Sequence, residues 1–491
     1  TYNHNKKMTL KDLKPELIFS IFEQITKVPR PSKKEEKIRE FLINFAKEHG
    51  IEYKTDAIGN VAMFRPASPG CENAPKVLLQ GHMDMVCVAE DGVEKDFDNE
   101  PIETIIDGEW VRAKGTTLGA DNGIGLAAGL AVLIDKSLVT PQVQTLFTVD
   151  EETSMGGASN LGAGMIDADI LLNLDSEDDG EICVGCAGGI GTNIEMEYEQ
   201  VAAPADYAFF SFKMSKFQGG HSGTDINTGR ANANKLTGRI LWNIMQKYPI
   251  ALVDVTGGDK HNAIPVKAEA TFGVPANDAE AVVAMLNEFA ATVKEEYKRT
   301  EPDVEFEVVK VDAPAQVMES DAARRFVYAL FTTQHGVYSM SCELEGLVET
   351  SNNLASVRLG DGKVKVITLQ RSAVDSRKYD LANQIEALWV LAGAKVEHAD
   401  DYPGWAPNMQ SKALQVASDI HENLFGFRPK TGAIHAGLEC GMFLLLYPKL
   451  DMISFGPTLR DVHSPKEAMH IPAVERFWTF LTTILETLAK G

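Results

Sequence analysis

The stretch Val77-Leu78-Leu79-Gln80-Gly81-His82-Met83-Asp84 decides the expected fold, because an apolar run without alternation ends in His and Asp. Continuous apolarity is typical of a strand that is covered on both faces, as in α/β sheets. Three more runs have the same character, at 145–149, 170–174 and 452–455. The Gly- and Ala-rich stretch 123–133 predicts a buried helix. We therefore expect an α/β fold with a central, mostly parallel sheet flanked by helices.

The middle of the chain has a different pattern, in which short strands and helices alternate. Strand-like stretches occur at 209–214, 266–274, 304–311 and 364–370, and helical patterns at 231–248, 278–297, 321–334 and 378–391. This order predicts an α+β insertion with two similar halves, although no repeat in the sequence is strong enough to prove duplication. We predict one domain made of residues 1–189 and 400–491, interrupted by a second domain at 190–399.

Length and charge restrict the class of protein. A chain of 491 residues is too long for one compact core, so two or more domains are expected. The formal charge is −23, from 47 basic and 70 acidic residues, and such a surface disfavours nucleic acid and anionic membrane as partners. No apolar run reaches the roughly 18 residues that cross a bilayer. The polar, basic residues 1–7 are not followed by an apolar signal core.

The six cysteines are sparse, which indicates reduced thiols and a cytoplasmic location. Cys183 and Cys186 form a C-x-x-C pattern. Without a second pair, this pattern is weak support for a zinc or redox site. We favour the ordinary interpretation, two small residues packed in a Gly-rich turn.

Several polar residues follow the predicted strands or open a predicted helix. His82 follows the first strand, Glu151-Glu152 the second and Asp175 the third, and Asp121 heads the Gly-rich helix. Taken singly, His82 would be a core histidine, Glu151-Glu152 a solvated loop and Asp121 a helix cap. Ligands of open α/β folds bind at the carboxyl ends of strands, so these segments can converge. Together, imidazoles and carboxylates at strand ends predict a metal site suited to zinc, cobalt or manganese.

A family resemblance adds to this interpretation. The following segments resemble the signatures of the co-catalytic zinc peptidase family: Gly81-His82-Met83-Asp84, Gly119-Ala120-Asp121-Asn122-Gly123, Asp150-Glu151-Glu152 and Asn173-Leu174-Asp175-Ser176. Gly219-Gly220-His221-Ser222-Gly223 and Asn262-Ala263-Ile264-Pro265 resemble its lid motifs, and His463 matches its C-terminal metal histidine. The resemblance spans nearly the whole chain, in order, with every ligand present.

The resemblance implies a role for each residue of the metal site. Asp121 would bridge two metals, with His82 and Asp175 on one, and Glu152 and His463 on the other. A shared carboxylate can offset repulsion between two dications held about 3.5–4 Å apart. The metals would lower the pKa of a trapped water toward about 7, and Glu151 would act as its general base. The ordinary alternative for Glu151 is a surface acid.

The family also implies a supporting residue and a peptide conformation. Asp84 would accept a hydrogen bond from the imidazole nitrogen of His82 that does not bind metal. The Asp121–Asn122 peptide resembles one that is cis in the family.

The resemblance implies that the domain at 190–399 is a lid that supplies substrate-binding groups to a catalytic domain. His221 would stabilise the oxyanion, with a loop histidine as the alternative. Asn262 and Arg371 would bind the free carboxylate of a dipeptide, with a surface salt bridge as the alternative for Arg371. Gly437 would let the substrate backbone approach. Because the lid is long and double, His221 would act within one chain, as a monomer or a homodimer. We expect the lid to close over substrate.

The activity implied is hydrolysis of dipeptides with a preference for Xaa-His substrates such as carnosine. This preference is implied by two stretches that carry the resemblance, the one that follows Asp175 through Cys183 to Gly189 and the one at His435–Gly441. Many relatives have a Gly-Gly-Thr-type segment where this chain has His435-Ala436-Gly437, so substrate contacts there are harder to transfer. The nearest alternatives are a broad aminopeptidase, a carboxypeptidase or an N-acyl amino acid hydrolase. A non-catalytic metal-binding protein is the alternative of another class, and the retention of Glu151 and every ligand argues against it.

Overall fold

The computed structural model describes residues 8–491, which form two compact units. The first unit takes in the described residues up to Gly185 together with Pro407–Ala433 and Leu438–Gly491, and the second takes in Cys186–Ala406 and Ile434–Gly437. Residues 1–7, in which no signal core was expected, lie outside the described part of the chain. Among residues 8–491, no helix combines the length and the apolarity that crossing a bilayer requires.

The unit boundaries differ from the predicted domain boundaries by short segments. The backbone explains the difference, because the Ala187 N–H donates to the Ala436 carbonyl at 3.0 Å and Cys186 pairs with Trp405. These bonds join residues 186–189, 400–406 and 434–437 to the second unit. The division into a catalytic domain (1–189 and 400–491) and a lid (190–399) remains a functional prediction.

The first unit is built on an eight-stranded sheet in the order β1-β2-β6-β3-β7-β21-β8-β20. The central strands are β6 (Val143–Thr148), β3 (Val77–His82), β7 (Ile170–Asn173) and β21 (Asp451–Ser454). They run parallel to one another and coincide with the four apolar runs of the sequence, which confirms those strand predictions. The outer pairs β1–β2, β2–β6 and β8–β21 are antiparallel. The outer strands are β1 (Glu52–Thr55), β2 (Val61–Arg65), β8 (Glu181–Cys186) and β20 (Lys430–Ile434).

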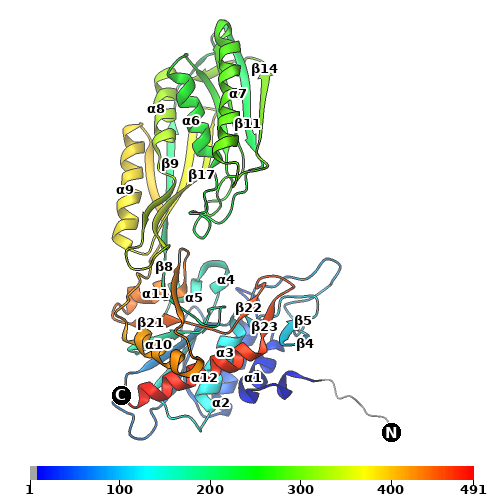
Figure 1. Ribbon diagram of the computed structural model, residues 1–491, viewed down its shortest axis with the longest axis vertical. Coiled ribbons are helices and arrows are strands. Elements are labelled where there is room, and N and C mark those ends of the chain that lie inside the picture. The colour runs from blue at the N-terminus through cyan, green and yellow to red at the C-terminus, as the bar shows by residue number, and fades with distance from the viewer. Residues whose placement is uncertain (1–7) are drawn as a thin grey trace. The chain divides into compact units, whose positions relative to one another are not determined.

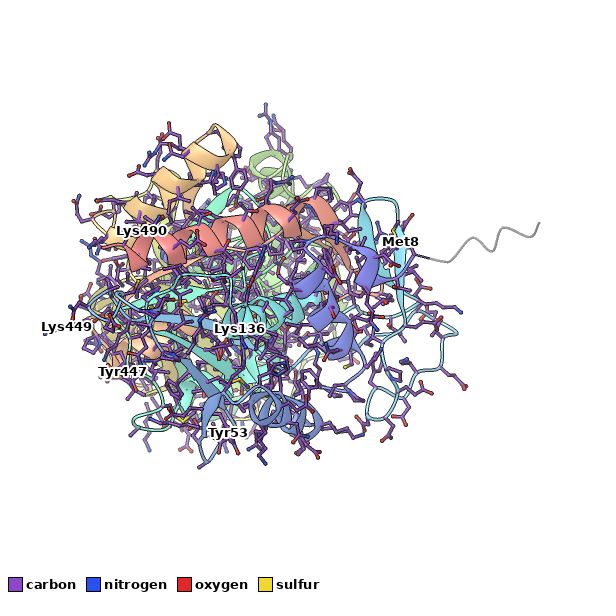
Figure 2. The ribbon with its side chains drawn as sticks, turned by 90° about the horizontal axis from the view of Figure 1, so that it is seen from below. Met8, Tyr53, Lys136, Tyr447, Lys449 and Lys490 are labelled. Atoms are coloured by element: carbon purple, nitrogen blue, oxygen red, sulfur yellow. The ribbon has the colours of Figure 1, made fainter. Side chains whose placement is uncertain are left out.

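Helices cover this sheet. The Gly-rich helix α3 (Ala120–Ile134) lies on β3 and β6 and is buried along almost its whole length, since α1 (Glu16–Thr26) packs over it. Helix α2 (Glu36–Glu48) contacts β1 and β2, and α10 (Lys412–Phe425) contacts β21 and α12 (Ile471–Ala489). Figure 2 shows α12 along the outside of the unit, with Lys490 at its C-terminal end. The smaller elements are η1 (Leu10–Asp12), α4 (Glu151–Ser154), α5 (Gly156–Ser159), α11 (Glu439–Leu446) and a sheet of β22 (Leu459–Arg460), β23 (Ala468–His470), β5 (Trp110–Ala113) and β4 (Thr104–Asp107).

The second unit contains a nine-stranded sheet made of two halves with the same topology. In the first half the chain runs β11 (Tyr207–Ser215), α6 (Ala233–Met245), β12 (Ala251–Gly257), β13 (Ala268–Pro275), α7 (Ala279–Glu296) and β14 (Glu305–Val311). In the second it runs β9 (Gly188–Glu197), α8 (Ser320–Thr332), β17 (Val348–Gly360), β18 (Lys363–Ser372), α9 (Asp375–Leu391) and β19 (Lys395–Tyr402). Each half is a β-α-β-β-α-β unit, and in each the fourth strand pairs with the first, the first with the third and the third with the second.

The two halves join through antiparallel pairing of β12 with β17, so the predicted pair of similar halves is present as topology. Helices α6, α7, α8 and α9, labelled in Figure 1, pack against the sheet through one shared apolar core. The remaining elements are β16 (Gly336–Met340), which pairs with β17, the ribbon β10 (Gln200–Ala202) with β15 (Gln316–Met318), and η2 (Ala276–Asp278).

Candidate active site

The predicted metal ligands of the first unit come from strand ends and the loops beside them. His82 is the last residue of β3, and Asp175 lies two residues beyond β7. Glu152 lies in the short helix α4 after β6, and Asp121 in the first turn of α3. His463 lies in the loop between β22 and β23. The parallel strands β3, β6 and β7 end on one edge of the sheet, which brings these side chains together.

Asp121 lies between the two histidines. Its Oδ1 is 2.9 Å from Nε2 of His82, and its Oδ2 is 3.0 Å from Nε2 of His463. His82 Nε2 is also 3.5 Å from Oδ1 of Asp175, and His463 Nε2 is 3.0 Å from Oε2 of Glu152. One carboxylate therefore faces two separate imidazole–carboxylate pairs.

Two groups of donor atoms in this cluster are close enough to hold a cation. Ligand atoms of His82, Glu151 and Asp175 lie within 4.8 Å of one another, and so do those of His82, Asp121 and Glu152. His463 adds a further nitrogen beside Asp121 and Glu152. Mixed imidazole and carboxylate donors suit zinc and similar divalent ions, so the residues present fit a metal centre.

A third acidic group, Glu35, Asp84 and Asp150, has the same spacing but a different role. Glu35 accepts the N–H of Asp150 at 2.8 Å, and Asp84 accepts the N–H of Glu151 at 3.0 Å. Asp150 accepts hydrogen bonds from the hydroxyls of Thr153 and Ser154. These oxygens already accept hydrogen bonds from local N–H and hydroxyl groups. The three carboxylates therefore hold in place the backbone beside the predicted ligands.

The charges of the cluster require a positive partner. Burial raises the pKa of Glu151 well above its ordinary range, and the charges of Asp175, Glu439 and Glu152 raise it further. Burial opposes a charge on His82, yet Asp175, Glu151 and Asp121 together raise its pKa well above the ordinary value. Hydrogen bonds from His463 and His82 outweigh burial at Asp121 and hold its pKa far below the usual range. Such opposed shifts in one cluster are typical of functional sites.

Asp84 is fully buried directly behind His82. Nδ1 of His82 is 2.9 Å from the backbone carbonyl of Asp84 and 3.3 Å from its Oδ1, so the carbonyl is the nearer acceptor. The hydroxyl of Ser32 donates to Oδ2 of Asp84 at 2.6 Å. The spacing of Ser32 to Glu35 in the sequence predicts a capping box, but this prediction is wrong, because helix α2 begins at Glu36 and Ser32 turns toward Asp84. Burial opposes ionisation of Asp84, but His82, Ser32 and the N–H of Glu151 lower its pKa to about 2.

Three positioning residues were not predicted. Asn122 donates to the Leu174 carbonyl at 2.8 Å and accepts the His82 N–H at 3.2 Å, which links three ligand-bearing segments. Glu467 accepts the N–H groups of Leu118, Gly119 and Asp121 at 2.9, 2.9 and 3.2 Å. In the sequence, the Gly-Ala-Asp-Asn-Gly motif was the one pattern that pointed to Asn122, and no local pattern pointed to Glu467.

Arg30 is the third of these residues and is only 1% exposed. Its guanidinium donates to the carbonyls of Met83 at 3.2 Å and Asp84 at 3.4 Å, and also to that of Gly119. It therefore ties the end of β3 to the Asp121 loop. Its place between two prolines, in Pro29-Arg30-Pro31, was the only local signal.

Several backbone outliers lie at or beside the predicted ligands. The Asp121–Asn122 peptide is cis, as the family resemblance implied. His463 has φ +63° and Asp150, which precedes Glu151, has φ +50°. Left-handed φ values are rare for residues other than glycine, and such outliers cluster at functional sites.

The other predicted residues lie in the second unit and form a cluster of their own. The segments around His221 and Asn262 pair, since the Ser222 N–H donates to the Asn262 carbonyl at 3.0 Å. Arg371, on β18, is 4% exposed and donates to the Ser222 hydroxyl at 3.2 and 3.4 Å. A third donor of Arg371 reaches the hydroxyl of Tyr402 at 3.0 Å. Burial and the charge of Arg371 lower the pKa of His221, which favours a neutral imidazole.

His435 joins this cluster, although the segments on either side of residues 434–437 belong to the first unit. Its Nε2 lies 2.7 Å from the hydroxyl of Ser351, the cross-strand partner of Arg371. A Cβ at Gly223 would clash with the carbonyl oxygen of His435, so only glycine fits there. Gly437 lies two residues on, at the end of the segment that belongs to the second unit.

The two cysteines of the C-x-x-C pattern lie in β8. Cys183 is half-buried with its thiol 3.3 Å from the Gly185 carbonyl, and Cys186 is buried.

Comparison with known proteins agrees with this geometry. The model of peptidase family M20/M25/M40 matches residues 78–487, which include every predicted ligand. The chain belongs to peptidase family M20/M25/M40. This member of the family is 39% identical over 479 residues to the cytosol non-specific dipeptidase of Escherichia coli strain K12, covering 98% of this chain and 99% of that protein.

Solved structures extend the comparison of this M20/M25/M40 peptidase. Aminoacylhistidine dipeptidase from Vibrio alginolyticus is 41% identical, with a TM-score of 0.93 and 98% of each chain covered. The chain is thus similar to an aminoacylhistidine dipeptidase over nearly its whole length. A tripeptidase from Staphylococcus aureus shares the fold at 15% identity, with a TM-score of 0.56 and coverage of 98% and 100%.

Proposed function

We propose that this M20/M25/M40 peptidase hydrolyses dipeptides with two divalent metal ions, and that its range includes Xaa-His substrates such as carnosine. The observation that carries the proposal is the position of Asp121, whose two oxygens face His82 and His463 beside Glu151. His82 with Asp175, and His463 with Glu152, would each hold one ion, and Asp121 would be shared. We favour zinc, with cobalt and manganese as alternatives.

Each group of the first unit has a role in this proposal. The metals, when bound, supply a water of lowered pKa and polarise the scissile carbonyl. Glu151 takes the proton of that water and passes it to the leaving amine. Burial raises the pKa of Glu151, which favours proton uptake by this carboxylate. Asp84 holds His82 from behind and fixes the backbone of Glu151.

The groups of the second unit supply substrate recognition in this proposal. Arg371 presents a planar guanidinium, held by Ser222 and Tyr402, to the free carboxylate of the dipeptide. Asn262, which is exposed, assists it. His221 donates to the oxyanion, and Gly437 leaves room for the substrate backbone. The lid closes over the bound substrate in this proposal.

The names of the similar proteins support dipeptidase activity, but they imply different ranges of substrates. One is named a non-specific dipeptidase and the other an aminoacylhistidine dipeptidase. Dipeptides with varied C-terminal residues, compared with tripeptides and N-acyl amino acids under defined metals, will measure this breadth. Tripeptides cleaved as fast as dipeptides would contradict the dipeptidase assignment. The first relative's name also supports a cytoplasmic location, and a monomer or a homodimer fits the proposal equally.

The decisive variants are Glu151→Gln and its neighbour Glu152→Gln. Loss of a general base costs about 10²–10⁴-fold in rate, so Glu151→Gln should bind its metals and lose hydrolysis. Glu152→Gln should lose metal as well as activity, because it removes a ligand. Metal content by atomic absorption and kcat on one dipeptide distinguish the two. A fully metallated wild type without activity would favour the non-catalytic alternative, and full activity of Glu151→Gln would remove its role as base.

A further inference from the structure

His435 has a buried nitrogen that the protein leaves without a partner. The side chain is 6% exposed, and its Nε2 lies 2.7 Å from the hydroxyl of Ser351. Its Nδ1 has no hydrogen-bond partner among the described residues. Nearly all buried polar atoms in folded proteins are hydrogen-bonded, so an exception in a native site calls for an explanation.

The surroundings of His435 identify what could complete this bond. Ser351 pairs with Arg371 across β17 and β18, and Arg371 donates to Ser222 beside His221. The charges of Arg371 and His221 both act on the imidazole. His435 therefore belongs to the same cluster as the groups proposed to hold the substrate.

The charge of His435 is also constrained. Burial, with Arg371 and His221 nearby, lowers its pKa to about 3, so the ring is neutral at pH 7. The Ser351 hydroxyl can donate to Nε2, which leaves the proton on Nδ1. A neutral N–H donor can bind an anion next to Arg371 without placing a second positive charge beside the guanidinium.

We propose that Nδ1 of His435 donates to the terminal carboxylate of the substrate alongside Arg371, which makes His435 a specificity-determining residue for peptides with a free C-terminus. This inference rests on the proposed dipeptidase function. It gives the His435-Ala436-Gly437 segment a role of its own in selecting against blocked peptides.

Two substitutions separate this role from a structural one. His435→Asn keeps a donor near the position of Nδ1 and loses the group at Nε2. His435→Gln keeps a donor near Nε2, where Ser351 lies, and loses the one at Nδ1. If Nδ1 binds the carboxylate, His435→Gln should raise KM for a dipeptide about tenfold, because one hydrogen bond to a charged group is worth about that factor. His435→Asn should stay within about threefold of wild type.

Binding is measured separately from turnover. A dipeptide isostere with a reduced peptide bond, and the same compound as its C-terminal amide, are titrated into the metal-loaded full chain by calorimetry. Wild type and His435→Asn should prefer the acid over the amide, and His435→Gln should lose about tenfold of that preference. Melting temperatures of both variants report on folding.

Three outcomes would overturn the proposal. The first is equal binding of acid and amide by wild type, the second an unchanged preference in His435→Gln, and the third a larger loss in His435→Asn, which would assign a structural role through Ser351. A wild type that binds the acid isostere selectively but hydrolyses no dipeptide would contradict the proposed function and leave the His435 assignment standing.

Discussion

The carboxylate of Asp84 accepts the backbone N–H of Glu151 at 3.0 Å through Oδ1. Its other oxygen accepts the N–H of Glu152 at 3.2 Å. The same buried side chain lies behind His82, so one carboxylate orients a proposed ligand and fixes the backbone of the proposed base. Asp84 therefore couples His82 to a backbone segment that lies 67 residues beyond Asp84 in the sequence.

Asp84→Asn should reduce activity more than it reduces stability. The amide keeps only one acceptor oxygen and loses the negative charge that lies 3.3 Å from Nδ1 of His82. Supporting residues of metal sites typically contribute roughly 10–100-fold in metal affinity or activity. We expect a loss of that size in kcat/KM, measured together with metal content.

Ser32→Ala is the matched control for Asp84→Asn. It removes only the hydroxyl that donates to Oδ2, and both backbone bonds of Asp84 remain. Its loss of activity should be less than about fivefold, which corresponds to roughly 1 kcal/mol for one hydrogen bond. Equal losses in the two variants would contradict the coupling assigned to Asp84.

Arg30→Met should weaken both folding and metal binding. The substitution leaves the carbonyls of Met83, Asp84 and Gly119 without their buried donor and removes a charge near Glu467. Breaking a buried charged network costs about 3–5 kcal/mol. The free energy of unfolding from urea titration and the zinc affinity from chelator competition should both fall.

Arg65→Met separates general destabilisation from an effect on the site. Arg65 also donates to three carbonyls, those of Val132, Asp135 and Leu138, but these lie at the end of α3 remote from Asp121 in sequence. It should cost about 1–3 kcal/mol of stability and leave zinc affinity unchanged. If both variants lowered zinc affinity equally, Arg30 would have no special role at the ligands.

Tyr402→Phe should raise KM for dipeptides while kcat stays nearly constant. The Tyr402 hydroxyl accepts from one arm of Arg371 at 3.0 Å, and its loss lets the guanidinium turn away from its proposed ligand. One hydrogen bond of this kind contributes about three- to tenfold in KM. A dipeptide amide, which lacks the carboxylate, should show no change.

Tyr338→Phe provides the comparison for Tyr402→Phe in the same unit. Its hydroxyl accepts from Gln384 at 3.0 Å on an exposed edge strand and touches no proposed substrate group. Its KM should equal that of wild type. A fall in kcat for Tyr402→Phe without a change in KM would contradict the positioning role.

The sequence predicts the centre of the first unit well, because the strands β3, β6, β7 and β21 are buried on both faces and therefore continuously apolar. The ligands follow from their places after those strands. The outer strands were missed, since β1 and β20 are short and partly exposed and lack that pattern.

The residues that support the site could not be predicted from local patterns. Arg30 reaches Met83 across 53 residues and Glu467 reaches Gly119 across 348. The prediction for Ser32 was wrong because its spacing to Glu35 fits a helix cap, whereas in the folded chain its hydroxyl donates to Asp84. His435 joins the second unit through a long-range bond to Ser351, which the chain order does not reveal.

His335 should make the stability of the chain depend on acid pH. Its Nδ1 accepts from the side-chain amide of Asn232 at 3.0 Å and from the Leu354 N–H at 3.2 Å, so the ring is neutral and protonation at Nδ1 would break both bonds. Burial, with the charge of Lys235, lowers its pKa to about 3. The ordinary value of 6.5 applies in the unfolded chain.

The direction of this pH dependence of stability follows from proton uptake. Between pH 6.5 and about 3 the unfolded chain binds a proton at this histidine and the folded chain does not. Stability from the neutral ring is therefore complete above pH 6.5 and is lost progressively as the pH falls toward 3. The slope is at most about 1.4 kcal/mol per pH unit, because the two states differ by at most one proton at this histidine.

His335→Asn tests this dependence. The Asn oxygen can accept in place of Nδ1 and does not titrate, so the variant should lose less stability than wild type between pH 7 and 5. Urea titrations of metal-free protein at both pH values avoid the acid release of metal from the first unit, and the difference between the two chains isolates this histidine. Identical pH slopes in wild type and variant would show that His335 does not carry the effect.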